Sequence, residues 1–504
     1  MPITHKGQGN MKQLHKVLAL IPIIAVFSCT DLHKDPVGLL TPDQISTDPT
    51  LSTVTTSVTS SYQMLSSTLN LLNEWRWDLG TVFRNDVIVS DMASDDVSKK
   101  WSPDGDQSWM DQVVSFNFTS SNQAFGGLWS YDYEGISRTN LAISYLTDAA
   151  VTSKIGIDAA LKNRLLGEAY FLRAFYYFDL VNNFGGVPLL LKPLVNFDEA
   201  YAVAKRESKE TVYTQISADL AQAKTLLPAS KFSDATDKWR ASRGAAIAMQ
   251  AKVALFNQKW ADVVTSVSEL EGLGYYSLDA NYFDNFSVAT EFAENETIFA
   301  YDHRSGATPR NGNGISAPLD WGFIAPTPSF LAEFEPNDPR LLYTVRVADK
   351  AVYKLLGATN KGYIGNDDAP GNKIYIRFAD VLLWKAEAYN ELGNPSQAIA
   401  LINRIRQRAR NGISVSGTAN PAGTLPDRDV AVTDKAQIKA WLIHERRVEL
   451  GFESQRFNDL KRWGIAKQVL TALGKNFQDR NYLYPIPQGE IDKSGGSITQ
   501  NPGY

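Results

Sequence analysis

Cysteine and histidine are scarce in this chain of 504 residues. Cys29 is the one cysteine, so no disulfide can form within the chain. Five histidines are present, and only His33, His303 and His444 follow Cys29. Because a serine or cysteine nucleophile is usually activated by a histidine base, a catalytic arrangement of that kind is hard to assemble from this sequence.

An excess of charge of one sign is also absent. The chain has 50 Lys and Arg residues and 55 Asp and Glu residues, which gives a net charge of −5. This balance provides no basic surface for a phosphate backbone, so we expect no nucleic-acid partner. Hydrophobic residues make up 44% of the chain, which is enough for a large core. Aromatic residues are plentiful, with 11 Trp, 21 Tyr and 23 Phe.

The apolar run at 17–27 is too short to cross a bilayer as a helix. It follows the basic residues Lys12 and Lys16 and ends in the sequence VFSC, a pattern typical of a secretory signal with a lipobox. We therefore predict that residues 1–28 are a lipoprotein signal peptide, with Met11 as the possible true start.

Cys29 would then be acylated and become the new N-terminus, with residues 29–41 as a lipidated tether. A lipid chain anchors a folded domain on a membrane surface without a transmembrane helix. The alternative is that Cys29 is a buried free thiol, as free cysteines often are.

Hydrophobic periodicity predicts a mainly α protein over 42–504, which the family resemblance described below implies to be a single domain. Apolar residues recur at steps of three and four in the stretches 49–72, 122–271 and 376–464, which predicts a helical scaffold there. Within the last stretch we expect one helix from 434 to about 463. The regions 75–118 and 272–371 lack this pattern and are expected to be loop-rich and to bind the ligand, with a short strand at 296–301.

Two helix pairs resemble tetratricopeptide repeats. Ala386, Tyr389 and Ala398 have the spacing of the small, aromatic and small positions of such a repeat. A looser pair spans 241–270. Stacked pairs of this kind form an α/α superhelix, which is the scaffold that we expect.

No metal or cofactor motif is complete. The sequence HERRV at 444–448 begins like a zinc-protease helix, but Val448 stands where the second histidine ligand is needed. The acidic pairs Asp104/Asp106 and Asp367/Asp368 lack the spacing of a calcium loop, so we interpret them as solvated turns. We expect no metal, no cofactor and no catalytic residue.

Glu445 falls on the apolar stripe of its predicted helix, where an unpaired carboxylate is too costly. It is either a general acid with a raised pKa or half of a structural ion pair with an arginine, and we favour the ion pair. Arg377, Arg446 and Arg447 are candidate partners. The arginines at 404, 406, 408 and 410 are interpreted as a solvated face.

Five tryptophans lie in loop-like sequence: Trp75, Trp77, Trp101, Trp109 and Trp321. An aromatic ring on a polar loop can stack on the C–H face of a sugar or clamp a peptide with little loss of conformational entropy. The alternative is that the loops fold down and bury these rings.

Several motifs, in this order along the chain, resemble the SusD/RagB family of outer-membrane lipoproteins. They are EAYFLRA (168–174), NFGGVP (183–188), RFADVLLWKAEA (377–388), ERRVEL (445–450), YPIP (484–487) and QNPGY (500–504). The resemblance covers almost the whole chain after the signal peptide.

The resemblance implies a SusD-like fold, with about four tetratricopeptide-like helix pairs and an irregular loop-rich subdomain. It also implies a non-enzymatic protein, anchored through Cys29 to outer-membrane lipid and exposed on the cell surface. Such a protein binds a glycan, or in some branches a peptide, and delivers it to a SusC-like TonB-dependent transporter. Arg377 and the residues from Glu445 to Glu449 would hold helices together, while the loops around Trp75 and Trp321 would contact the ligand.

We therefore expect an oligosaccharide-binding or polysaccharide-binding uptake lipoprotein. The alternatives are a RagB-like peptide binder, a secreted glycoside hydrolase with two carboxylates across a sugar site, and a helical-repeat adaptor.

Overall fold

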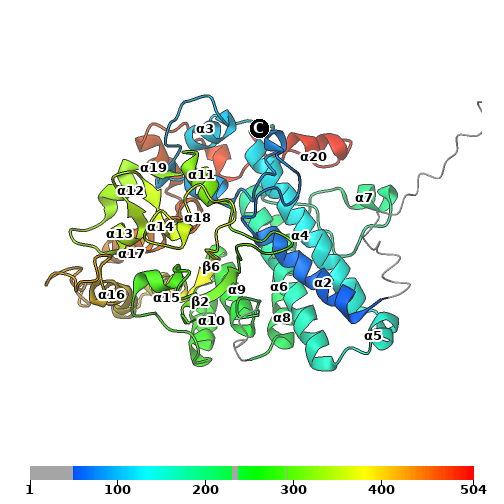
Figure 1. Ribbon diagram of the computed structural model, residues 1–504, viewed down its shortest axis with the longest axis horizontal. Coiled ribbons are helices and arrows are strands. Elements are labelled where there is room, and N and C mark those ends of the chain that lie inside the picture. The colour runs from blue at the N-terminus through cyan, green and yellow to red at the C-terminus, as the bar shows by residue number, and fades with distance from the viewer. Residues whose placement is uncertain (1–48, 230–236, 292) are drawn as a thin grey trace, which may run out of the picture. The chain divides into compact units, whose positions relative to one another are not determined.

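The computed structural model describes residues 49–229, 237–291 and 293–504 (Figure 1). The predicted signal peptide, Cys29 and the tether at 29–41 lie outside the described residues. From Leu51 to Tyr504 the chain forms one compact unit. No helix in the described part of the chain is both long and apolar enough to cross a membrane.

The scaffold is made of helices, as the hydrophobic pattern predicts. They are α2 (Leu51–Tyr62), α4 (Gln123–Thr147), α5 (Ala149–Ile155), α6 (Ala159–Phe184), α7 (Phe197–Val203), α8 (Lys209–Leu226), α9 (Arg243–Phe256), α10 (Trp260–Gly272), α15 (Phe378–Glu391), α16 (Pro395–Asn411), α17 (Lys435–Leu450) and α18 (Arg456–Arg462). Each long helix packs on the next along the series α4, α6, α8, α9, α10, α15 and α16, and α17 packs on α15 and α16 (Figure 1). This succession is the mainly α architecture expected from the sequence.

Side-chain caps fix where these helices begin. Asn122 accepts a hydrogen bond from the backbone N–H of Ala124, and Asp158 and Ser208 do the same for N–H groups in the first turns of α6 and α8. Such caps satisfy donors that have no partner inside the helix. At its other end α6 stops at Gly185, whose φ of 75° is one that glycine adopts readily.

Short elements make up the irregular subdomain and the C-terminal segment. They are the 3₁₀ turns η1 (Gln63–Leu65), η2 (Trp77–Leu79), η4 (Tyr282–Asn285) and η5 (Asp479–Tyr482), the π turn η3 (Ile88–Met92), the strands β1 (Val97–Ser98), β2 (Thr297–Tyr301), β3 (Ala325–Pro326), β4 (Val345–Arg346), β5 (Ala351–Val352) and β6 (Lys373–Arg377), and the helices α3 (Ser108–Ser115), α11 (Ser316–Asp320), α12 (Pro328–Glu333), α13 (Arg340–Thr344), α14 (Tyr353–Leu356), α19 (Ala466–Ala472) and α20 (Gln488–Lys493). The strands form three antiparallel pairs, β1 with β3, β2 with β6, and β4 with β5. The fully buried β2 is the strand expected at 296–301.

Two predicted helices end earlier than expected. The first does not continue to Leu72, because η1 stops at Leu65 and Ser66 turns to an extended conformation, where its hydroxyl accepts a hydrogen bond from the N–H of Thr68. Serine side chains compete in this way with helical hydrogen bonding. The second, expected to run from 434 to about 463, is broken after Leu450.

The break between α17 and α18 coincides with a close contact that only glycine allows. Gly451 lies against the ring of Phe330, and a Cβ at this glycine would be 2.4 Å from the ring. Phe452 and Ser454 then have positive φ angles of 64° and 57°. Both features depend on packing against a distant segment, so local periodicity does not reveal them.

Buried ion pairs join the helices at the centre of the scaffold. Arg377 is 1% exposed, and its Nη1 lies 2.7 Å from Glu296 Oε1 and 2.7 Å from Glu449 Oε1, while its Nε lies 2.7 Å from Glu453 Oε2. Burial alone would raise the pKa of Glu449, but Arg408, Arg377 and Arg340 together lower it below its usual range. Glu449 is therefore a charged structural residue.

The other suggested ion-pair residues are also buried and paired. The pairs are Glu445 with Arg340 (2.6 Å) and Arg406 (3.2 Å), Arg446 with Asp380 (2.7 Å) and Asp459 (2.7 Å), and Arg447 with Asp96 (2.7 Å) and Glu333 (2.7 Å). The general-acid interpretation of Glu445 finds no support in this arrangement, because two guanidinium groups face its carboxylate.

The interpretation of the arginine row on α16 as a solvated face is wrong for two of its four members. Arg406 and Arg408 are 0% and 7% exposed. Arg408 pairs with Glu296 at 2.9 Å and also with Glu449. The side chain of Arg404, in contrast, is 45% exposed. The two middle members of the row turn inward because acidic partners from distant segments lie there.

His444 provides a pH-dependent link between α17 and the irregular subdomain. Its Nδ1 lies 2.7 Å from Glu333 Oε1 and its Nε2 lies 3.1 Å from Glu335 Oε1. Burial would lower the pKa of His444, but hydrogen bonds to the two glutamates outweigh this and raise it to about 9. The proton on His444 is therefore held more tightly in the folded state.

We expect this proton to stabilise the fold fully below pH ~6.5, the pKa of an unperturbed histidine, and to lose its effect as the pH rises through 9. The size of the effect is on the order of 3 kcal/mol. Urea unfolding of the wild-type protein and of His444→Gln between pH 6 and pH 10 measures it. The free energies of unfolding should converge at high pH, and a constant difference across the range would contradict this account.

Candidate ligand-binding site

Four of the five loop tryptophans meet on one surface. The ring centroids of Trp75 and Trp321 are 6.4 Å apart, and those of Trp77 and Trp321 are 6.0 Å apart. Phe83 and Phe323 support the group from beneath, each with its ring edge-on to Trp77 at 6.1 and 6.0 Å. Segments that are more than 240 positions apart in the chain thus build one aromatic cluster.

Trp101 joins this cluster through the pairing of β1 with β3. The pairing continues past the strands, because the N–H of Lys100 donates a 2.7 Å hydrogen bond to the carbonyl of Gly322. The ring of Trp101 then lies directly on Gly322, where a Cβ would be 2.4 Å from Cδ1 of the indole. Gly322 also has a φ of 81°, so both its conformation and its lack of a side chain allow this contact.

These four residues, Trp75, Trp77, Trp101 and Trp321, form what we call the tryptophan platform. Trp101 is 60% exposed, Trp75 is 49% exposed and Trp321 is 37% exposed, while Trp77 is half-buried. Exposed indole rings gathered at one place mark an interaction surface more often than a structural core. They are rigid and lose little conformational entropy when a ligand stacks on them.

The backbone holds Trp75 outward at some cost. Its φ of 45° lies in the left-handed region, which costs a residue other than glycine on the order of 1 kcal/mol. The N–H of Trp75 donates to Asn70 Oδ1 at 3.0 Å, and its carbonyl accepts a hydrogen bond from the N–H of Trp77. Local strain of this kind, maintained for an exposed ring, favours a functional role for Trp75.

Trp109 does not belong to the platform, which corrects the expectation for this residue. It is 5% exposed on α3, and its Nε1 donates a 2.7 Å hydrogen bond to Gln107 Oε1. Asn122 donates to the Trp109 carbonyl at 2.9 Å and thereby attaches α3 to the start of α4. The short helix α3, which sequence periodicity missed, turns this tryptophan into the core.

Polar groups accompany the platform at its edge. Arg76 and Asp78 form a bidentate ion pair at 2.9 and 2.8 Å, and both are exposed. Lys100 places its Nζ 4.9 Å from the ring centroid of Trp101 and donates to the carbonyl of Asp349. Such groups can donate and accept hydrogen bonds around a stacked ligand.

The described residues provide no metal-binding cluster next to the platform. Among them, no group of three or more His, Cys, Asp or Glu side chains is arranged to hold a metal ion. His303 is buried, and its Nε2 accepts a hydrogen bond from the N–H of Ser67. Burial lowers the pKa of His303 to about 3, so the ring is neutral and structural.

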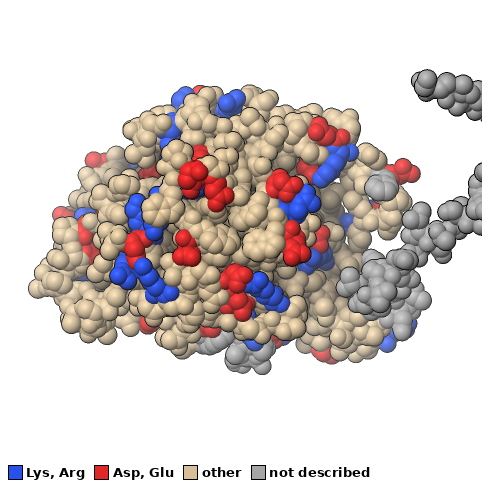
Figure 2. All heavy atoms as spheres, turned by 45° about the horizontal axis from the view of Figure 1, so that its top comes forward, with Lys and Arg blue, Asp and Glu red and all other residues tan. Residues whose placement is uncertain are grey.

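Charges on the molecular surface are mixed in sign. Figure 2 shows Lys and Arg side chains in small groups beside Asp and Glu side chains, separated by uncharged surface. This face therefore has no extended basic or acidic region that would favour a polyanion or a polycation.

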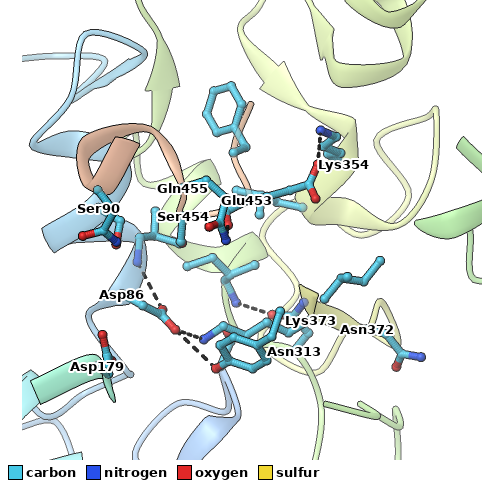
Figure 3. A pocket seen from close by; sticks show the side chains of 18 of the residues that line it. Asp86, Ser90, Asp179, Asn313, Lys354, Asn372, Lys373, Glu453, Ser454 and Gln455 are labelled. Atoms are coloured by element: carbon cyan, nitrogen blue, oxygen red, sulfur yellow. Dashed lines mark hydrogen bonds and ion pairs between the residues drawn. The ribbon is translucent and has the colours of Figure 1, made fainter. Parts of the chain in front are cut away.

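A small, partly open pocket with both apolar and charged lining lies between η3, β6 and the turn after α17 (Figure 3). Its volume is about 100 Å³, less than the roughly 300 Å³ at which ligand pockets usually begin. Its charged groups already have partners, since Lys373 lies 2.6 Å from Asp86 and Lys354 lies 2.6 Å from Glu453. We assign this pocket to the buried ion-pair framework.

Two family models match the chain. The model described as "SusD family" covers residues 338–504, and the model described as "Starch-binding associating with outer membrane" covers residues 46–255. The chain belongs to the SusD/RagB family.

Similar proteins share this fold over nearly their full length. SusD-like protein P2 of Formosa agariphila is 27% identical, with 97% of this chain and 99% of that protein covered. The structure of surface glycan-binding protein A from Bacteroides fluxus superposes with a TM-score of 0.72 at 26% identity and covers 90% of this chain and all of that one. A laminarin-binding SusD-like protein superposes with a TM-score of 0.71 at 25% identity over the same shares.

Proposed function

We propose that this protein binds an oligosaccharide or polysaccharide on the tryptophan platform, without catalysis. The observation that supports the proposal most strongly is the convergence of Trp75, Trp101 and Trp321, all exposed, on one surface. Indole faces match the flat C–H faces of pyranose rings, and the neighbouring amide, hydroxyl and charged groups can bind sugar hydroxyls. The glycan-binding names of two similar structures support the same ligand class.

The proposed role extends to nutrient uptake at the cell surface. In this proposal the lipid on Cys29 anchors the protein to the outer membrane, and the bound glycan passes to a SusC-like TonB-dependent transporter. The lipobox-like sequence before Cys29 and the family model described as associating with the outer membrane support this role. A carrier of this kind needs a ligand that dissociates, which suits stacking contacts on an open surface.

Isothermal titration calorimetry of the intact protein against a glycan panel tests the proposed ligand class. We expect at least one polysaccharide, among laminarin, starch, mannan, xylan and pectin, to bind with a dissociation constant in the micromolar range, about −8 kcal/mol. Absence of binding to all of them, together with binding of a mixed peptide library, would contradict the glycan proposal and favour a peptide-binding role.

A further inference from the structure

A cleft separate from the tryptophan platform opens at the loop around Tyr363. It has a volume of about 690 Å³ and is formed by the segments 281–289, 357–363 and 413–417. This volume lies within the range of ordinary ligand sites. We call it the loop cleft.

Aromatic rings form part of the loop cleft. Phe283 and Tyr343 are stacked, with ring centroids 5.4 Å apart and an interplanar angle of 17°. Tyr343 is held in place because its hydroxyl donates a 2.7 Å hydrogen bond to the carbonyl of Ile413. Tyr363, on the opposite loop, is half-buried and also lines the cleft. The cleft therefore offers ring faces of the kind that the platform offers.

The remaining lining is polar and almost uncharged. Amide and hydroxyl groups come from Asn281, Asn360, Thr359 and Ser414, and Asp284 is the one ionisable acid or base, tyrosines apart, among the described lining residues. Asp284 already accepts a 3.2 Å hydrogen bond from Asn281. A cleft with this lining favours a neutral polyhydroxylated ligand over an anionic one, because it offers no cation to neutralise a carboxylate or sulfate.

A short path of backbone and contacts connects the loop cleft to the platform. Tyr363 is two residues from Gly365, whose N–H donates a 3.2 Å hydrogen bond to the carbonyl of Ser316 in α11. Gly365 also packs on Asp320, where a Cβ would be 3.0 Å from the carboxylate, and Asp320 directly precedes Trp321. Counting these steps along the backbone puts Tyr363 within about 20 Å of Trp321.

We propose that the loop cleft binds a second segment of the glycan chain that stacks on the tryptophan platform. The ligand is then an uncharged polysaccharide long enough to reach from Trp321 over the loop to Tyr363, and a disaccharide occupies the platform alone. This inference rests on the proposed function and adds to it the length and the charge of the ligand.

The test compares a polysaccharide with its own disaccharide. The probes are laminarin with laminaribiose or, where starch, mannan or xylan is the polymer that binds the intact protein, that polymer with maltose, mannobiose or xylobiose. The variant Tyr363→Ala/Asn360→Ala alters the cleft, Trp321→Ala alters the platform, and Tyr201→Ala is the control, since Tyr201 is a 58% exposed tyrosine on α7. Thermal unfolding of each variant confirms that it is folded.

We expect the cleft variant to lose about tenfold in affinity for the polysaccharide and less than about twofold for the disaccharide. Trp321→Ala should lower the affinity for both probes, and Tyr201→Ala should change the affinity for neither. If the cleft variant keeps its affinity for the polysaccharide while Trp321→Ala still lowers it, the proposed role of the loop cleft is overturned and the proposed function stays intact. Binding of pectin alone, the anionic polymer of the panel, would overturn the inference, and failure on the whole glycan panel would overturn the proposed function as well.

Discussion

The double variant Trp75→Ala/Trp321→Ala should lose about 100-fold or more in affinity for the polysaccharide that binds the intact protein. Removal of an aromatic anchor from a binding surface commonly costs ~1.4 kcal/mol or more, which is tenfold for each ring. These two indoles are two of the three exposed rings of the platform, so their loss leaves Trp101 as the remaining exposed stacking surface. Titration calorimetry measures the change.

Folding should be almost unaffected in this double variant, because both side chains are well exposed. Trp321→Phe keeps a ring at the same place and should retain most of the affinity. Tyr201→Ala, on α7, removes an exposed ring outside the platform and should bind as the wild type does. A double variant that binds within about threefold of the wild type would show that the platform is not the glycan site.

Replacement of Arg377 by alanine should destabilise the protein by about 3–5 kcal/mol, the range for breaking a buried ion pair. Arg377 contacts Glu296, Glu449 and Glu453 at 2.7 Å each, so its removal leaves three buried carboxylates without their shared cation. Urea unfolding monitored by circular dichroism measures the loss. Arg377→Lys keeps the charge without the three-way contact and should lie between alanine and the wild type.

Arg404→Ala is the matched control, because the side chain of Arg404 is 45% exposed and its nearest carboxylate, on Glu271, is 3.7 Å away. An exposed pair contributes about 0–1 kcal/mol to the free energy of unfolding.

The lowered pKa of Glu449 in the folded state adds a pH dependence. The charge on Glu449 stabilises the fold at pH values above 4.5, the ordinary pKa of a glutamate, and this stabilisation is lost as the pH falls. The difference in free energy of unfolding between Arg377→Ala and the wild type should therefore become smaller at acid pH. A loss below about 1 kcal/mol for Arg377→Ala would contradict the structural role.

The helical scaffold could be predicted from the sequence because its signals are local. Periodic apolar residues and capping residues such as Ser208 and Asp434 give the start of a helix within a few positions. The break after Leu450 could not be predicted, since it depends on the contact of Gly451 with Phe330, a residue from α12.

The candidate site was predictable by residue type and only partly by position. Tryptophans in polar loops indicated a stacking surface, but β1 and β3, the strands that bring Trp101 to Gly322, have two residues each, too few for a periodic pattern. The inward position of Trp109 could not be predicted either, because it depends on the short helix α3, which local periodicity missed. Arg406 and Arg408 turn inward for a related reason, since Glu445, Glu449 and the other partners come from distant segments.

The arrangement of the loops is therefore the part of the molecule that the sequence predicts least and the structure defines most. Segments from the two irregular regions, together with the loop at 413–417, assemble the platform and the loop cleft, and the helices supply a rigid support joined by buried ion pairs. Because the ligand-binding residues lie on loops and the scaffold is separate, the loops can define which ligand is bound while the scaffold stays the same.

A crystal structure of the protein with the polysaccharide fragment that binds best in the glycan panel tests the central claim most directly. The account predicts sugar rings in van der Waals contact with the indole faces of Trp75 and Trp321. A fragment bound at another place, with those two rings left open to solvent, would contradict it.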